Sequence, residues 1–138
     1  MREDDLLISL HRTVSKMDRT FAAVCKEHGL TLAQFAVMQA LYRYGDQTIG
    51  ELREAAISSD GTISVVIKNL EKLEMVRRKE NPGDRRSAVI SLTDGGRRMF
   101  QAACPDRNRA LEHETAVWTP AEQKRLQELL QKYLDAHR

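Results

Sequence analysis

Two adjacent arginines, Arg85 and Arg86, directly follow the sequence Asn81-Pro82-Gly83-Asp84, whose residue types favour a tight turn. A short extended segment at residues 75–79 precedes this turn, and residues 88–92 alternate between apolar and polar side chains, as strands do. The pattern predicts a two-stranded hairpin that exposes both guanidinium groups at its tip. A cation on such a thin ribbon has the shape and charge to enter a DNA minor groove, which is about 6 Å wide and strongly negative.

Asp84 and the surrounding charges support the same interpretation. The Asp84 carboxylate stands two residues before Arg86, so it can pair with that guanidinium and fix its direction, which reduces the entropy lost on docking. Residues 68–98 contain nine Lys and Arg and five Asp and Glu, a net charge of +4, while the rest of the chain carries −2. This local basic charge favours a polyanionic partner. The alternative is a solvated basic turn that binds nothing.

A helix at residues 59–74 precedes the hairpin and could also read DNA. Helical spacing gives it a buried stripe made of Ile63, Val66, Ile67, Leu70 and Leu73. The opposite face presents Thr62, Ser64, Val65, Lys68 and Asn69, which together supply small hydrogen-bonding groups, a cation and one apolar side chain. Such groups can approach base edges and phosphates. Ser59 can cap this helix, whose first amides can bind a phosphate.

Local signals predict the other helices. Apolar residues recur at steps of three and four from residue 7 to residue 24, as in an amphipathic helix. A capping box at Thr31 and Gln34 starts a second helix, which ends near Gly45, and a short third helix covers residues 49–56.

Two more helices are predicted after the hairpin. Thr93 caps a long segment with a weak apolar stripe, which Pro105 is expected to kink or break. The last helix begins at Thr119, followed by Pro120 at the first helical position and Glu122 at the third.

These elements give an α+β fold that is mainly α with a small β-hairpin. Two helices in tandem with a hairpin after the second form a winged helix-turn-helix, whose second helix enters the major groove of DNA. We divide the chain into an N-terminal dimerisation helix at residues 1–30, a winged helix-turn-helix DNA-binding domain at 31–93 and C-terminal dimerisation helices at 94–138. A homodimer is predicted because a tandem-helix core of about 60 residues cannot cover the apolar stripes of both long terminal helices. Its twofold axis would match two DNA half-sites about one helical turn apart.

Three runs around the hairpin carry a family resemblance: LEKLEMVRR at residues 70–78, NPGDRR at 81–86 and VISLTDGG at 89–96. Together they resemble the wing signature of the MarR family of bacterial transcriptional regulators. The resemblance implies a homodimer with interlocking N- and C-terminal helices, in which Arg86 enters the minor groove and Arg78 supports the wing.

The same resemblance implies that Asp84 orients Arg86 and that the helix at residues 59–74 enters the major groove. One position departs from the family pattern. Glu74 stands where these regulators commonly have glycine, at the end of that helix, where a left-handed residue is needed. Glutamate disfavours that conformation and carries the wrong charge for a helix C-terminus, so a different exit turn is expected.

Composition and the absence of certain sequence motifs limit the classes of function that the sequence predicts. Of the 138 residues, 41% are hydrophobic and 30% are charged, which is typical of a globular protein. No apolar run approaches the roughly 20 residues of a membrane helix, and the N-terminus is acidic, so we expect a cytoplasmic protein without a membrane partner. A nucleophile elbow, a phosphate loop and paired catalytic carboxylates with a histidine are all missing from the sequence. It therefore predicts no enzyme, no catalytic residues and no cofactor.

The cysteines and histidines leave alternatives open. Cys25 lies at the predicted junction of dimerisation helix and DNA-binding domain, and some MarR-type regulators sense peroxide through a thiol; a small buried hydrophobic residue is the simpler interpretation. Cys104, beside Pro105, has no resolving partner that the sequence can place. No metal site is predicted, because no two histidines have the spacing that places them on one helical face: His11, His28, His113 and His137.

The predicted function is that of a sequence-specific DNA-binding regulator, a repressor that binds a pseudo-palindromic operator as a homodimer. Members of the MarR family often bind aromatic acids or lipophilic compounds between the dimer helices and the winged domain. Residues that could line such a site are His11, Arg12, Phe35, Met38 and Tyr42. Phe35 and Met38 are more simply core residues. A winged-helix module that binds a protein partner is the alternative from another class.

Overall fold

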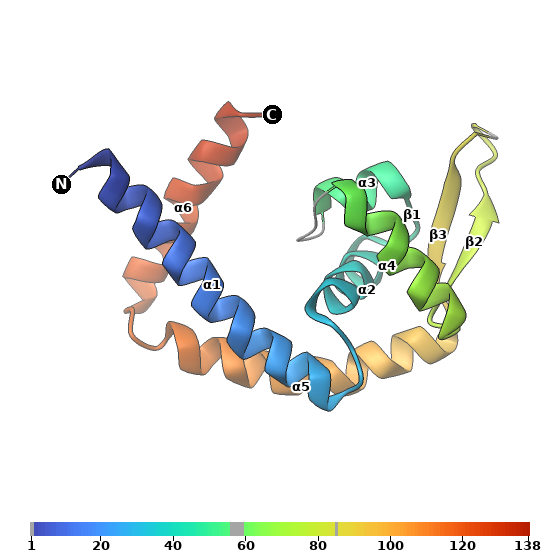
Figure 1. Ribbon diagram of the computed structural model, residues 1–138, viewed down its shortest axis with the longest axis horizontal. Coiled ribbons are helices and arrows are strands. Elements are labelled where there is room, and N and C mark those ends of the chain that lie inside the picture. Colours follow the sequence, from blue (N-terminus) through green and yellow to red (C-terminus); the bar gives the residue numbers. More distant parts are fainter. Residues whose placement is uncertain (1, 56–59, 85) are drawn as a thin grey trace.

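The long helix α5 (Asp94–Thr115) connects the two parts of the chain (Figure 1). On one side lie α1 (Glu3–Glu27) and α6 (Pro120–Ala136), and on the other lie three shorter helices and a small sheet. The computed structural model describes residues 2–55, 60–84 and 86–138. The fold is mainly α with a small antiparallel sheet, as predicted.

The core lies where α2 (Leu32–Tyr44), α3 (Ile49–Ala55) and α4 (Asp60–Lys72) meet the sheet and α5. Its fully buried side chains include Met38, Leu52, Ile63, Ile67, Leu70 and Ile90. The predicted stripe of the fourth helix is confirmed except at Leu73, which is exposed. The helix ends at Lys72, so Leu73 no longer follows the helical phase that would turn it toward the core.

The sheet has three strands, in the order β1-β3-β2, rather than the two that the hairpin pattern predicts. β2 (Val76–Glu80) and β3 (Ala88–Leu92) form the expected antiparallel hairpin. β1 (Gln47–Thr48) adds two residues to the other edge of β3, where they pair with Ile90 and Val89. Two residues carry no periodicity, so sequence reasoning could not detect this strand.

The exit from α4 is a Schellman turn with Glu74 in the left-handed conformation, at φ 59°. Two backbone bonds define it: the amide of Met75 donates to the carbonyl of Leu70 over 2.9 Å, and the amide of Glu74 donates to Glu71 over 2.9 Å. The Thr93 hydroxyl also donates to the Glu74 carbonyl over 2.6 Å. The expected change of turn is therefore wrong, because these bonds impose on glutamate the conformation that glycine would adopt without strain.

Replacing Glu74 by glycine is expected to raise the free energy of unfolding by about 0.5–1 kcal/mol, because it relieves the left-handed strain of an L-residue. Urea denaturation of Glu74→Gly measures this gain. Glu74→Gln is the matched control, since it removes the charge at the helix end and keeps the strained backbone. Equal stability of the two variants would show that charge, not conformation, limits this turn.

Helix α5 runs unbroken through Pro105, so the predicted break is wrong. Proline at this position removes a donor to the carbonyl of Gln101. Both residues are exposed, so water can bind that carbonyl. Packing of α5 against α1 and α2 holds the helix on both sides of the proline, with the neighbouring Ala103 buried in the core.

Candidate nucleic-acid interface

Helix α4 presents the outer face that its periodicity predicts. Lys68 and Asn69 are exposed, Ser64 is half-buried, and Val65 keeps 55% of its surface accessible although it is apolar. The inner face is fixed by the buried Ile63, Ile67 and Leu70, so rotation of the helix is not available. Ser59 lies outside the described residues, as does the side chain of Thr62. The visible part of this face carries a cation, two hydrogen-bonding groups and a methyl-rich side chain.

The β2–β3 hairpin projects beyond the helices next to α4 (Figure 1). Its turn is closed by polar side chains that bond locally. The carbonyl of the Asn81 side chain accepts from the amide of Gly83 over 3.1 Å, and its Nδ2 donates to the Ser87 hydroxyl over 3.1 Å. Arg86 is exposed at this tip, and Arg85 lies outside the described residues.

Asp84 holds Arg86 in a different way from the one predicted. Its Oδ1 accepts from the backbone amide of Arg86 over 2.9 Å, whereas no ion pair joins the Arg86 guanidinium to any described residue. The carboxylate therefore fixes the backbone from which Arg86 extends, in an Asx turn. Two residues of separation suit this backbone bond, and the guanidinium stays available to a partner.

Two ion pairs join strand β2 of the hairpin to other elements. Arg78 Nε donates to Glu71 Oε1 of α4 over 2.8 Å, which agrees with the supporting role implied for Arg78. Lys79 Nζ lies 3.5 Å from Asp46 Oδ2, in the turn before β1. Sequence reasoning did not single out Glu71, Asp46 or Lys79, because each pair joins separate elements and follows no short-range spacing.

A cleft of about 660 Å³ lies between the start of α3 and the hairpin. Four basic side chains line it together with small polar groups and one carboxylate: Arg53, Arg78, Lys79, Arg86, Thr48, Ser87 and Glu80. Like charges on a concave surface add their fields, so this side of the molecule attracts anions. Three of the nine basic residues of segment 68–98, Arg78, Lys79 and Arg86, thus meet Arg53 of α3 in this cleft.

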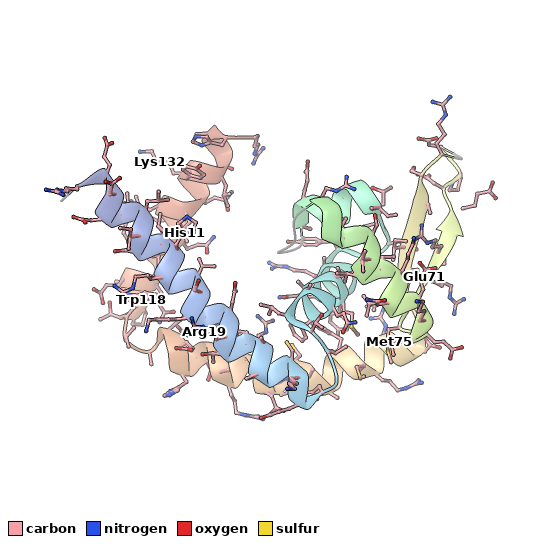
Figure 2. The ribbon with its side chains drawn as sticks, viewed as in Figure 1. His11, Arg19, Glu71, Met75, Trp118 and Lys132 are labelled. Carbon is pink, nitrogen blue, oxygen red and sulfur yellow. The ribbon has the colours of Figure 1, made fainter. Side chains whose placement is uncertain are left out.

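The five residues predicted for an effector site do not meet in the chain. Phe35 and Met38 are buried in the core, which matches the simpler interpretation of both as core residues. The Tyr42 ring packs against Phe100 in a tilted arrangement, with ring centroids 4.7 Å apart. His11 and Arg12 are exposed on the N-terminal half of α1, and Figure 2 shows His11 on the part of that helix that lies away from α2.

Cys25 is a core residue, with 1% of its surface exposed. Burial raises the pKa of its thiol, and the positive charge of Arg107 opposes that shift only in part. The thiol form therefore dominates at neutral pH, and the nucleophilic thiolate is scarce. Cys104 is half-buried and packs against the same core. This environment matches the simpler interpretation of Cys25 as a small hydrophobic residue.

We expect Cys25 to react more slowly than Cys104 with a disulfide reagent in the folded chain. Because the Cys25 pKa is raised, its labelling rate should still be increasing at alkaline pH values where an exposed thiol has levelled off. The single-thiol variants Cys104→Ser and Cys25→Ser isolate the two rates, and urea should abolish the difference. Fast labelling of Cys25 at neutral pH would instead support the alternative in which this thiol senses peroxide.

The described residues contain no group of three or more His, Cys, Asp or Glu side chains that could hold a metal ion. Among them, none of the helices has both the length and the apolar character needed to cross a bilayer.

The geometry defines a class of protein. A helix with an exposed polar face stands beside a projecting basic hairpin, and both are fixed to one core. This is the winged helix-turn-helix arrangement of DNA-binding regulators.

Comparison with known proteins identifies the family. The family model described as transcriptional regulator SarA/Rot matches residues 19–103. The transcriptional regulator MhqR of Bacillus subtilis is 28% identical over 127 residues, which are 92% of this chain and 88% of MhqR. The chain belongs to this family of MarR-like winged-helix transcriptional regulators, as the hairpin sequence indicated.

Two solved structures are similar over most of their length. A cysteine-to-serine variant of MarR from E. coli, in complex with operator DNA, has a TM-score of 0.84 and 26% identity, with 94% of each chain covered. BpsR of Bordetella bronchiseptica, whose DNA binding is regulated by 6-hydroxynicotinic acid, has a TM-score of 0.84 and 25% identity. That match covers 94% of this chain and 98% of BpsR.

Proposed function

We propose that this chain is a homodimeric repressor that binds a pseudo-palindromic operator and releases it when a small aromatic or lipophilic effector binds. The observation that carries the proposal is that the hairpin bearing the exposed Arg86 stands next to α4 (Figure 1), whose polar face is exposed as well. One surface can then engage two adjacent grooves of a duplex.

Helix α4 is the element proposed to enter the major groove. Asn69 and Ser64 can donate to and accept from base edges, and Lys68 can pair with a phosphate or a guanine. The exposed methyl groups of Val65 fit against the methyl group of thymine. An apolar side chain that is left in water on an otherwise polar face gains most from such a contact.

The hairpin is proposed to place Arg86 in the flanking minor groove. Its guanidinium is exposed and forms no ion pair with another described residue, so docking breaks no internal salt bridge. The Asx turn at Asp84 already fixes the backbone of Arg86, which lowers the entropy lost on binding.

The apolar surface of the long helices supports the homodimer. A groove of about 560 Å³ separates α1, α5 and α6, and its apolar lining includes Leu6, Leu10, Val14, Leu111, Leu126 and Leu130. Leu129 and Leu134 extend the apolar surface along α6 and are also exposed. Contiguous apolar surface of this extent marks an interface. A second copy supplies a matching surface through twofold symmetry and sets the spacing of the two α4 helices.

Repression and release complete the proposal. A dimer across two half-sites covers about two turns of duplex, and this excludes other proteins from that DNA. An effector that binds better to a dimer with another spacing of its α4 helices would lower the affinity for DNA, and bound DNA would lower the affinity for the effector by the same factor. The similarity to BpsR, whose DNA binding a small aromatic acid regulates, supports this part of the proposal.

Selection of DNA from a random-sequence pool tests the function. We expect the selected duplexes to share an inverted repeat with half-site centres about 10 base pairs apart, and binding to weaken steeply as salt rises. Light scattering should give twice the chain mass of 15.8 kDa. A pool without enrichment, or a salt-insensitive complex, would favour a protein-interaction module instead. An asymmetric site bound by a monomer would refute the dimer.

A further inference from the structure

Two consecutive basic residues of β2 are held by carboxylates from two different elements. Arg78 bonds to Glu71 of α4 over 2.8 Å, and Lys79 lies 3.5 Å from Asp46, which precedes β1. Consecutive strand residues point to opposite faces of a sheet. The carboxylates therefore hold the hairpin on both faces, in the middle of the strand pairing at Arg78 and one residue further out at Lys79. Figure 2 shows Glu71 on the part of α4 that lies next to the hairpin.

The strand register shows on which face of the sheet each ion pair lies. Arg78 pairs with Ile90, which is fully buried, so the ion pair of Arg78 with Glu71 lies on the core face of the sheet. Lys79 pairs with Val89 on the opposite face. Because Gln47 pairs with Ile90, Asp46 stands opposite Ser91, and the Ser91 hydroxyl donates to Asp46 Oδ1 over 2.7 Å. One carboxylate thus joins the edge of β1 to both β3 and β2.

The position of the outer part of the hairpin depends on these two ion pairs. β1 pairs with Ile90 and Val89 of β3, and among the described strands the pair of Glu80 and Ala88 at the outer end of the ribbon has no third strand beside it. The turn residue Gly83 lies five positions beyond Arg78, roughly 16 Å along an extended strand. A rotation of about 10° at the base would then move the tip by roughly 3 Å, which is enough to break a hydrogen bond.

We propose that Glu71 and Asp46 are positioning residues that fix the hairpin relative to α4, so that Arg86 and the outer face of α4 reach DNA together. This inference rests on the proposed function and adds to it two acidic residues that do not touch the nucleic acid. Glu71 sets the hairpin against the helix that enters the major groove. Asp46 fixes the hairpin relative to β1, the third strand of the sheet.

The sign of the effect separates positioning from simple electrostatics. Both carboxylates lie beside the basic surface that faces the polyanion, so deleting either charge alone should strengthen DNA binding and steepen its salt dependence. Loss of positioning should weaken DNA binding, although the chain has become more positive. The two explanations therefore predict opposite changes in Kd.

The experiment measures Kd of the full chain for a duplex that the unaltered chain has selected from a random pool. Glu71→Gln and Asp46→Asn are each tested with and without Arg86→Ala. Glu74→Gln is the matched control, because Glu74 is exposed at the same end of α4 and forms no ion pair with a described residue. Thermal denaturation checks that each variant folds. The exchange Glu71→Arg with Arg78→Glu, compared with Glu71→Arg alone, tests whether a reversed pair restores binding.

We expect Glu71→Gln and Asp46→Asn to raise Kd by about three- to tenfold, no more than Arg86→Ala does. In the Arg86→Ala background neither should raise Kd further, because the residue being positioned is gone. Glu74→Gln should leave Kd unchanged or lower it, and the reversed pair should recover binding. Unchanged or tighter binding by the two variants, or equal losses in both backgrounds, would overturn the inference. If the unaltered chain selects no duplex, the proposed function itself fails, which is a separate outcome.

Discussion

Replacing Gly96 by alanine is expected to lower the free energy of unfolding by about 2–4 kcal/mol. A Cβ atom at this position would lie 2.1 Å from the carbonyl oxygen of Met75 and 2.9 Å from its carbonyl carbon. That backbone cannot easily withdraw. Its amide donates to Leu70 over 2.9 Å, and its carbonyl accepts from the amide of Thr93 over 3.0 Å. Urea denaturation followed by circular dichroism measures the loss.

The adjacent Gly95 supplies the control. A Cβ atom there would meet only the Thr93 hydroxyl at 3.7 Å and the Glu74 carbonyl at 3.9 Å, which are ordinary contacts. Both glycines lie in the first turn of α5, so their helix propensities count alike. Gly95→Ala should therefore change stability by less than about 0.5 kcal/mol. Equal losses at the two positions would show that propensity, and not the contact with Met75, sets the requirement for glycine.

Structure that depends on neighbours in the chain could be predicted from the sequence. The helix starts at Thr31, Thr93 and Thr119 are confirmed, because an N-cap bonds to an amide three residues away. The inner and outer faces of α4 follow from its helical period. The turn of the hairpin was predicted for the same reason, since its residues bond to one another.

Features that depend on distant parts of the chain could not be predicted. The glycine pair before residue 97 gives no sign that Gly96, unlike Gly95, lies against Met75, because that contact joins two separate elements. β1 exists only because β3 offers it an edge. Phe35 and Tyr42 both come from α2 and both pack against Phe100 of α5, yet the first is buried and the second is exposed.

The candidate site shows the same division. Arg86 could be assigned to the hairpin tip, because a turn and a strand define that tip within a few residues. The role of Asp84 was only partly predicted: its position was correct, but it bonds to a backbone amide and not to the guanidinium. Glu71 and Asp46 come from two other elements, and no short-range spacing links them to Arg78 and Lys79.

Replacing Arg86 by alanine is expected to weaken binding to a selected duplex by about 1–3 kcal/mol, as for a good groove contact. Arg86 is exposed and forms no ion pair with a described residue, so its loss leaves no buried charge unpaired in the protein. Stability should therefore stay within about 0.5 kcal/mol of the unaltered chain, as for most surface changes. Fluorescence anisotropy at several salt concentrations measures the affinity, and thermal denaturation measures the stability.

The kind of contact follows from two further variants. Lys132→Ala removes one positive charge from α6, on the opposite side of the molecule from the hairpin (Figure 2). It should barely change affinity if the basic surface beside α4 is the one that meets DNA. Arg86→Lys keeps the charge and loses the planar fork of donors. If it binds as tightly as the unaltered chain, Arg86 meets a phosphate; if it loses affinity for the selected duplex but not for random DNA, Arg86 reads the groove. If Arg86→Ala and Lys132→Ala lose the same affinity for the duplex, the net charge of the protein alone explains both losses, and the hairpin has no specific role in binding.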